Sequence, residues 1–260
     1  MARKDPVILI PIGFPTVHPG QDLSDVVAKA IQAENLNLRK GDVVAIASKV
    51  VSLCEKRIVK LHEVRVSARA RRSAKRWEMD ERLASLVLGE ADTVLGGVKG
   101  FLLTIKDGIL TANAGVDLKN SPPGTATLWP EKPDNSARRV RKFLQRKYRT
   151  RLGVEIVDSR VTPLRLGTVG LAIGLSGFRP VQDERNSRDL YGRRVRVTQS
   201  NIADDLAASS HMLMGESKQR VGAVVLRNAP IRIESSGNSS QTKLNKARCL
   251  VTSNLTSVDG

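Results

Sequence analysis

The 260-residue chain is poor in the side chains that build soft-metal, disulfide and base-stacking sites. Its two cysteines, Cys54 and Cys249, lie far apart and form no CxxC pair, so we expect no disulfide framework and a reduced, cytoplasmic compartment. Its three histidines, His18, His62 and His211, are scattered without a second soft ligand nearby, which argues against a zinc site. Aromatic residues make up 3% of the chain, so there are few rings on which nucleic-acid bases could stack.

Several common motifs are missing as well. No apolar run approaches the length that spans a membrane, and Val7–Pro11 is too short for the apolar part of a secretory signal, so we expect no membrane segment. The chain has no GxxxxGK(S/T) phosphate loop and no GxGxxG turn that opens a helix after a strand. No serine–histidine–aspartate or cysteine–histidine set can be argued from the scattered residues. Any nucleotide site must therefore bind the phosphates through another kind of loop.

The charge of the chain is strongly one-sided. Lysine and arginine number 43 against 26 aspartate and glutamate residues, which gives a formal net charge of +17. Dense basic stretches lie at Lys56–Arg76 and Arg138–Arg151. Such stretches can bind nucleic acid or an anionic small substrate, or they can be solvated helix faces. Because aromatic residues are not interleaved with the basic runs, we expect a nucleic-acid partner less than a small anion.

The pattern of apolar residues predicts an α/β (α+β) protein with mixed sheets. The prediction rests on the order of the expected elements, because strands and helices alternate unevenly and a hairpin turn lies at Lys106-Asp107-Gly108. The expected strands are Val7–Pro11, Val43–Ala47, Thr93–Leu95, Phe101–Ile105, Ile109–Ala112, Val154–Val157, Arg194–Gln199 and Gly222–Arg227. The expected helices are one capped by Asp22, one that starts at Pro133, and three at Val64–Trp77, Met79–Glu90 and Asn201–Met214.

The chain divides by composition into two regions. Residues 1–228 carry the expected strands and helices, with about 93–195 as a candidate inner subdomain. Residues 229–260 form a tail rich in serine, asparagine and threonine, which we expect to be partly disordered.

The stretch Asn113–Thr125 leaves regular structure abruptly, because Pro122-Pro123-Gly124 cannot continue a helix or a central strand. A carboxylate, Asp117, lies there between two amides, Asn113 and Asn120. Carboxylate and amide oxygens on a tight turn suit a hard cation or a phosphate site. The same residues also suit a surface turn whose side chains cap their own backbone.

A second carboxylate follows the expected strand Val154–Val157, which we predict to end at Asp158-Ser159. If the two segments are neighbours, Asp117 and Asp158 can hold one divalent cation, Ser159 can add a hydroxyl, and Glu216 can come near. The alternative is that Asp158 caps a turn and Asp117 stays solvated. The strand Val43–Ala47 delivers Ser48 and Lys49 at its carboxyl end, where ligand groups of α/β sheets commonly lie.

Six blocks of the sequence carry a resemblance to a known family. They are Gly41–Arg57, Asn113–Trp129, Asp158–Gly174, Asp189–Thr198, Ile202–Ala208 and Met214–Glu216. These blocks resemble the coenzyme F420-0:L-glutamate ligase family, the gamma-glutamyl ligases of the deazaflavin coenzyme. Their order and spacing match over roughly Pro11–Arg227, and the tail from about Ala229 is not covered.

The resemblance implies a function, a mechanism and an assembly. The family joins L-glutamate to the lactyl-phosphate side chain of F420-0 and hydrolyses GTP to do so. It requires Mg²⁺ or Mn²⁺, is helped by K⁺, and has an α/β fold that forms an intertwined homodimer. A phosphate from GTP would activate the substrate carboxylate as an acyl phosphate, which the glutamate amine then attacks. The protein would position these anions and neutralise their charge.

The resemblance also implies roles for matching residues. Asp117 and Asp158 would hold a first metal ion, Ser159 would hold a second, and Asn120 would contact the nucleotide. The segments that would wall the GTP site comprise Phe14, Pro15, Thr16, Val17, Ser48, Lys49, Met214, Gly215, Glu216, Ser217, Lys218, Gln219, Arg220 and Val221.

Three departures from the family pattern fall at these proposed contacts. Leu53 stands where the family usually has lysine, Val161-Thr162 stands where it has Gly-Arg, and Ser217–Arg220 replaces a glycine-rich loop. Without those glycines the backbone approaches a phosphate less closely, although Lys218 or Arg220 can supply charge instead. They motivate one alternative, a divergent relative that binds another anionic ligand without ligation. A basic nucleic-acid-binding protein is the other, motivated by charge alone.

Overall fold

A five-stranded mixed sheet forms the centre of the molecule. The computed structural model describes residues 5–255, and the sheet order is β1-β12-β2-β8-β9. The strands β2 and β8 are parallel, and the other neighbouring pairs are antiparallel. This mixed architecture confirms the predicted fold class. The bounds are β1 Ile8–Gly13, β2 Val43–Ala47, β8 Gly153–Val161, β9 Thr168–Ser176 and β12 Val221–Arg227.

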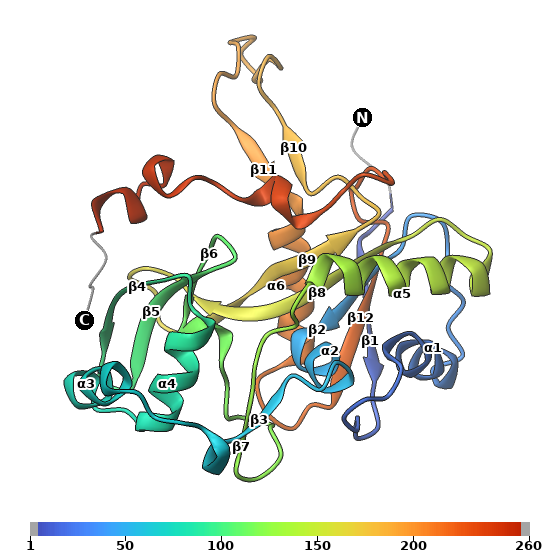
Figure 1. Ribbon diagram of the computed structural model, residues 1–260. Helices are drawn as coiled ribbons and strands as arrows, with labels where there is room; N and C mark the ends of the chain where they lie inside the picture. The colour runs from blue at the N-terminus through green and yellow to red at the C-terminus, as the bar shows by residue number, and fades with distance from the viewer. Residues whose placement is uncertain (1–4, 256–260) are drawn as a thin grey trace.

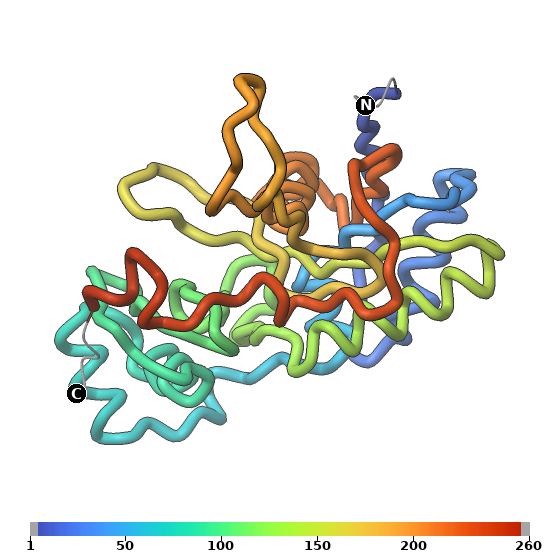
Figure 2. The backbone as a smooth tube through the Cα atoms, turned by 90° about the horizontal axis from the view of Figure 1, so that it is seen from above, coloured from blue at the N-terminus to red at the C-terminus, as the bar shows by residue number. Residues whose placement is uncertain are grey.

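Helices cover both faces of this sheet, as Figures 1 and 2 show. On one face lie α1 (Leu23–Ala33), the short α2 (Ser48–Cys54) and α5 (Pro133–Tyr148), and on the other lies α6 (Ile202–Met214). The strand β2 is apolar throughout because Val44 and Ile46 pack toward the first face while Val43 and Ala45 pack toward the second.

Capping side chains explain where the helices begin. The Asp22 carboxylate accepts a hydrogen bond from the Asp25 amide and starts α1, as the sequence predicts. Pro133 occupies the first turn of α5, where its missing N–H leaves no bond unmade. Two predicted helices begin a few residues later than expected, because Ser67 and Asp80 cap them. They are α3 (Ala68–Trp77) and α4 (Glu81–Glu90).

A second lobe packs its own small core beside the main sheet. Three antiparallel strands, β4 (Thr93–Val98), β5 (Phe101–Lys106) and β6 (Ile109–Ala112), lie against α4, with α3 packed on α4. The predicted hairpin between β5 and β6 is present, and both Asp107 and Gly108 have positive φ, as a tight two-residue turn requires. A short pair, β3 (Ile58–Lys60) and β7 (Thr125–Thr127), connects this lobe to the central turn.

Two sequence predictions about strands are wrong. The strand β8 does not end at Asp158-Ser159 but continues to Val161, because β9 pairs with it along that length, with Asp158 opposite Leu171. Glycine makes this pairing compatible with α6, since a Cβ atom on Gly170 would lie 2.2 Å from the Ala207 carbonyl oxygen.

The expected strand Arg194–Gln199 is not formed, and its residues belong to a projecting hairpin arm. The base of the arm is the antiparallel pair β10 (Val181–Asp183) and β11 (Gln199–Asn201). Beyond this base, backbone hydrogen bonds still join the two sides of the arm, as from the Asn186 amide to the Val195 carbonyl at 2.9 Å.

The tail runs from the main sheet across to the second lobe (Figure 1). Its described part, up to residue 255, contains short 3-10 helices at Ser239–Thr242, Lys246–Arg248 and Thr252–Asn254. The Asp134 carboxylate at the start of α5 accepts hydrogen bonds from the amide and hydroxyl of Ser239 and holds the tail there. Of the tail that we expect to be partly disordered, residues 229–260, the last part, 256–260, lies outside the described residues. None of the helices between residues 5 and 255 combines the length and apolar character of a membrane span.

One buried side chain in β8 works against stability. Glu155 is 0% exposed, and neither of its carboxyl oxygens has a hydrogen-bond partner among the described residues. Burial, with a contribution from the nearby Asp204 charge, raises the pKa of Glu155 well above its ordinary value of 4.5. Folding therefore favours the neutral form of this carboxyl group, whereas the unfolded chain ionises it at a lower pH.

We expect Glu155→Met to raise the free energy of unfolding by about 1–3 kcal/mol near pH 8, because it removes an unpartnered buried polar group. The gain should shrink toward about pH 5: a raised folded-state pKa costs nothing below the unfolded-state pKa and costs progressively more as the pH rises above it. Urea unfolding at both pH values measures the difference. Glu155→Gln is the matched control and should flatten the pH dependence with less gain. A destabilised methionine variant would contradict the prediction.

Candidate functional site

A cavity of about 950 Å³ opens at the carboxyl end of β2, which delivers Ser48 and Lys49 there as predicted. The two residues begin the short helix α2, which was not predicted. Five segments of the chain surround the cavity: the loop after β1, the end of β2 with the start of α2, the central turn, the middle of β8, and the end of α6 with the loop after it. The predicted residues among its lining are Phe14, Pro15, Thr16, Val17, Ser48, Lys49, Asp117, Asn120, Asp158, Ser159, Met214, Gly215, Glu216, Ser217, Lys218, Arg220 and Val221.

Asp158 is held from two sides. Its Oδ1 accepts a hydrogen bond of 2.9 Å from the Ser48 hydroxyl, and its Oδ2 accepts one from the indole N–H of Trp129. Burial raises the pKa of the Asp158 carboxyl, and the bonds from Trp129 and Ser48 oppose part of that rise. These two hydrogen bonds therefore orient the carboxylate before any ligand binds. The sequence did not predict Trp129 as one of the two donors.

Asp117 is presented by a tightly folded central turn. Its backbone exchanges hydrogen bonds with Thr127 in both directions, at 2.9 and 2.8 Å. Its Oδ1 accepts the Lys119 amide at 2.8 Å, so it caps its own turn, while its Oδ2 lies 2.5 Å from Lys49 Nζ. Asn113 instead faces the second lobe, where its Oδ1 accepts the Leu102 amide at 2.8 Å.

Glycine lets the turn pack closely on Trp129. Gly115 has φ of +73°, and a Cβ atom there would lie 2.3 Å from the indole nitrogen. The turn that carries Asp117 and the tryptophan that holds Asp158 thus pack against each other.

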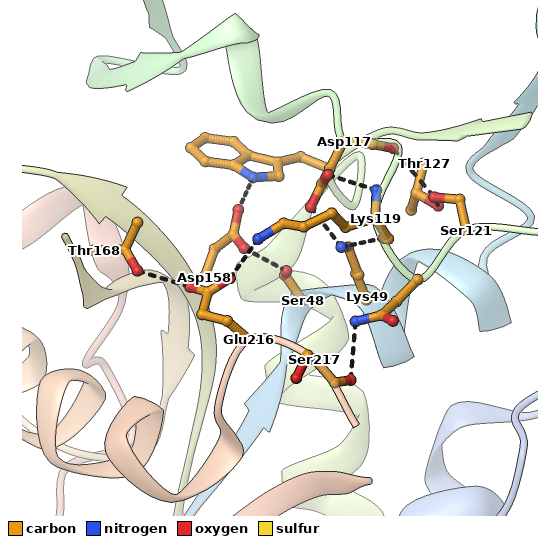
Figure 3. A network of polar contacts seen from close by, with 12 residues as sticks. Ser48, Lys49, Asp117, Lys119, Ser121, Thr127, Asp158, Thr168, Glu216 and Ser217 are labelled. Atoms are coloured by element: carbon orange, nitrogen blue, oxygen red, sulfur yellow. Dashed lines mark hydrogen bonds and ion pairs between the residues drawn. The ribbon is translucent and has the colours of Figure 1, made fainter. Parts of the chain in front are cut away.

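Glu216, in the loop after α6, contacts side chains from three other segments of the chain (Figure 3). Its Oε1 accepts the Thr168 hydroxyl at 2.9 Å and lies 2.8 Å from His211 Nε2, and its Oε2 pairs with Lys119 Nζ at 2.9 Å. Burial raises the pKa of Glu216, but the hydrogen bonds from Lys119, His211 and Thr168 outweigh it and lower that pKa to about 2. Glu216 is therefore ionised throughout the physiological range.

The sequence prediction missed Lys119, Trp129, Thr168 and His211. Lys119 and Thr168 reach Glu216 from 97 and 48 residues away, a separation that no local pattern reveals. His211 looks isolated in the sequence because its partner, Glu216, lies just beyond the end of α6 at Met214. The available signal was that Lys119, Trp129 and Thr168 fall within the blocks Asn113–Trp129 and Asp158–Gly174.

The loop after α6 is held by contacts from both sides of the cavity. The Phe14 amide donates to the Arg220 carbonyl at 2.9 Å, and the Asn120 amide group donates to the Ser217 carbonyl at 3.3 Å. One predicted residue, Gln219, does not line the cavity. It turns back into its own loop, where its Oε1 accepts the Ser217 amide at 2.9 Å. Leu53, which stands where the family usually has lysine, does line the cavity and presents an apolar surface there.

The donor set fits a hard cation that is completed by a ligand. Within residues 5–255 no cluster of three or more histidine, cysteine, aspartate or glutamate side chains could hold a metal on its own. Asp117, Asp158 and Ser159 nevertheless line one cavity, and each has oxygen atoms of the kind that bind hard cations. Magnesium-type sites commonly use one or two carboxylates, with phosphate and water oxygens filling the remaining positions. The residues therefore fit such an ion, and a zinc-type cage is absent from the described part of the chain.

Curated relatives match most of the chain. A protein of Methanopyrus kandleri named coenzyme F420:L-glutamate ligase is 38% identical over 219 residues, which is 84% of this chain and 85% of the relative. Proteins of the same name from Methanothermobacter thermautotrophicus and Archaeoglobus fulgidus are each 35% identical, over 84% and 86% of this chain and 87% and 88% of their own.

The match extends across the fold. Residues 11–228 match the family model described as F420-0:Gamma-glutamyl ligase, a span that includes the five strands of the main sheet apart from the start of β1. This span agrees with the resemblance seen in the six sequence blocks and contains every residue that lines the cavity. The chain therefore belongs to the F420-0:gamma-glutamyl ligase family.

Proposed function

We propose that this protein adds L-glutamate to coenzyme F420-0 in a reaction that uses GTP and a divalent metal ion. The observation that carries the proposal is the meeting of Asp117 and Asp158 in one cavity with several cationic side chains. A volume of about 950 Å³ suits a nucleotide. The names of the relatives support the ligase activity, and the cation-rich lining supports anionic substrates. We place the reaction in the cytoplasm.

The reaction we propose has two balanced steps. An oxygen of the lactyl carboxylate of F420-0 attacks the γ-phosphorus of GTP, the bond from that phosphorus to the bridging oxygen breaks, and GDP leaves. The glutamate amine then attacks the carbonyl carbon of the acyl phosphate. Inorganic phosphate leaves, an amide bond forms, and the amine loses a proton. Both steps join anions, so positioning and charge neutralisation are the main tasks of the protein.

Residues of the cavity divide these tasks. Lys49, Lys218 and Arg220 place positive charge along the phosphate path, and Asn120 contacts the nucleotide. When bound by Asp117, Asp158 and Ser159, Mg²⁺ or Mn²⁺ would supply charge neutralisation at the phosphates. Trp129 and Ser48 keep Asp158 oriented. We also expect K⁺ to assist, as the family resemblance implies.

Purified protein with GTP, L-glutamate, Mn²⁺, K⁺ and F420-0 is expected to release GDP and to lengthen the coenzyme by one or more glutamates. Mass spectrometry of the coenzyme and chromatography of the nucleotide measure the two products. Omitting glutamate or the metal ion should abolish the lengthened product. If no GTP is hydrolysed while a nucleotide still raises the melting temperature, a divergent anion-binding relative is the better account. Salt-sensitive binding of random DNA without ligase activity would favour the nucleic-acid alternative.

Asp158→Asn is expected to remove the metal-dependent part of nucleotide stabilisation without unfolding the protein. Wild-type protein with Mn²⁺ and excess GDP should melt about 5 °C or more above the protein alone, because ligand that binds only the folded state stabilises it. The variant should lose this metal-dependent shift, because a neutral amide oxygen binds a divalent cation more weakly than a charged carboxylate does. Its own melting temperature should stay within about 3 °C of wild type, since an amide oxygen still accepts from Trp129.

The exposed Asp25 on α1 offers a matched control, because Asp25→Asn removes the same charge away from the cavity. It should keep the full metal-dependent shift. A collapse of the fold in Asp158→Asn, with an unaffected control, would instead assign Asp158 a structural role.

We also propose that the protein is a homodimer in which the hairpin arm contacts a second copy of the chain. The arm projects from the body of the molecule (Figure 2). It carries large apolar side chains in solvent, with Leu190 at 100% and Tyr191 at 84% exposure. Apolar side chains gathered on a projecting arm are typical of a surface that another chain covers. A second copy is the occupant that the family resemblance implies.

The double variant Leu190→Asp with Tyr191→Asp is expected to convert the assembly from a dimer to a monomer, because it places charge in an apolar interface. Light scattering after size-exclusion chromatography reports the change as a halving of the mass. Leu250→Asp is the control, since Leu250 is 92% exposed in the tail. A monomeric wild-type protein, or a double variant that stays dimeric, would contradict the proposed contact.

A further inference from the structure

Lys119 places an ammonium group among the three carboxylates of the cavity. Its Nζ lies 2.9 Å from Glu216 Oε2, and that hydrogen bond is the main reason that the pKa of Lys119 is raised, with Asp117 and Asp158 adding to the effect. Figure 3 shows the side chain reaching from the loop of Asp117 toward Asp158 and Glu216. Positive charge is therefore already supplied to the acids that would hold a cation.

The charges around the cavity indicate how this ammonium group affects the affinity for a metal ion. Asp117, Asp158 and Glu216 carry three negative charges when ionised, and the ammonium groups beside them belong to Lys49 and Lys119. Lys49 is already paired with Asp117. A divalent cation that enters while both lysines stay meets a nearly neutral cluster and is repelled by the adjacent ammonium groups. If Lys119 moves away, the same cation meets two uncompensated carboxylates.

The backbone of Lys119 is fixed while its side chain can move. The amide donates to Asp117 Oδ1 at 2.8 Å, and the carbonyl accepts a hydrogen bond from Lys49. The side chain is 62% exposed and ends a flexible stem of four methylene groups. Its partner Glu216 keeps the Thr168 and His211 contacts when the lysine departs. The ammonium group can therefore exchange Glu216 for another anion without rearranging the turn.

We infer that Lys119 couples metal binding to nucleotide binding. With no phosphate in the cavity, its ammonium group stays with the acids and weakens metal binding. A phosphate group that enters takes over the ammonium, which removes its charge from beside Asp158 and Glu216 and so strengthens binding of the cation at Asp117 and Asp158. This inference rests on the proposed nucleotide- and metal-dependent function. It predicts that the metal and the nucleotide each raise the affinity for the other, by the same factor.

Lys119→Gln tests the inference through binding of Mn²⁺ alone, followed by electron paramagnetic resonance of free Mn²⁺ in the absence of nucleotide and substrate. The variant should bind Mn²⁺ about fivefold to tenfold more tightly than wild type, because a competing cation has been removed. Saturating GDP should then raise the Mn²⁺ affinity less in the variant than in wild type. Lys119→Arg keeps the charge and should behave as wild type in both measurements.

Lys99→Gln is the matched control. Lys99 is 78% exposed and pairs with Glu78 at 2.6 Å in the second lobe, so its removal changes net charge equally without touching the cavity. Equal Mn²⁺ affinity in Lys119→Gln and wild type, with binding abolished by Asp158→Asn, would overturn the inference and leave the proposed metal site intact. Mn²⁺ binding that Asp158→Asn does not weaken would overturn the proposed metal site, and the coupling with it.

Discussion

The hydrogen bonds from Ser48 and Trp129 to Asp158 are the constraint on which the cavity depends. They join residues 110 and 29 positions from Asp158 in the chain, so they connect the main sheet to the start of α2 and to the segment that leads from the second lobe to α5. A carboxylate enclosed by protein is stable only when its oxygens have donors. The same two bonds that make burial of Asp158 tolerable therefore also fix its direction and the relative position of the segments around it.

A further layer of polar contacts supports Trp129 from behind. The Arg57 side chain donates to the Trp129 carbonyl at 2.9 Å and pairs with Glu90 at 2.8 Å, and Glu90 also pairs with Lys106 at 2.7 Å. Burial raises the pKa of Glu90, but Lys106 and Arg57 outweigh it and lower that pKa. Part of the large positive charge of the chain is thus paired inside the protein, where it positions the residues around the cavity instead of facing solvent.

The sequence predicts best those features that short-range physics decides. The apolar run Val43–Ala47 is a strand because both of its faces are buried, and Asp22 caps α1 because its side chain reaches an amide three residues on. The end of β8 was predicted wrongly because the apolar pattern stops at Asp158, whereas the pairing with β9 decides how far the strand runs. The length of β8 is therefore set by its pairing with β9 and by glycines of β9, such as Gly170, that leave room for α6.

The candidate site shows the same division. Residues within motif blocks, such as Asp117 and Asp158, could be named in advance because a resemblance supplied their long-range relationship. Trp129 lies at the end of such a block, yet its role depends on the indole N–H meeting a carboxylate from another strand. His211 and Thr168 acquire significance only because Glu216 stands between them. Contacts of this kind follow from packing of whole elements, which composition and spacing do not encode.

The departures from the family pattern alter the kind of positive charge that the cavity offers. A glycine-rich loop binds phosphate through backbone amides, which are fixed in place, whereas this loop turns Gln219 onto its own backbone and presents Lys218 and Arg220 to the cavity. Leu53 offers no charge, so positive charge at the acids comes from Lys49 and Lys119. Side-chain cations differ from backbone amides in one physical respect: they can leave a carboxylate for a phosphate. A cavity built this way can link the arrival of its anionic ligand to the exposure of its acids, which a rigid amide cradle cannot do.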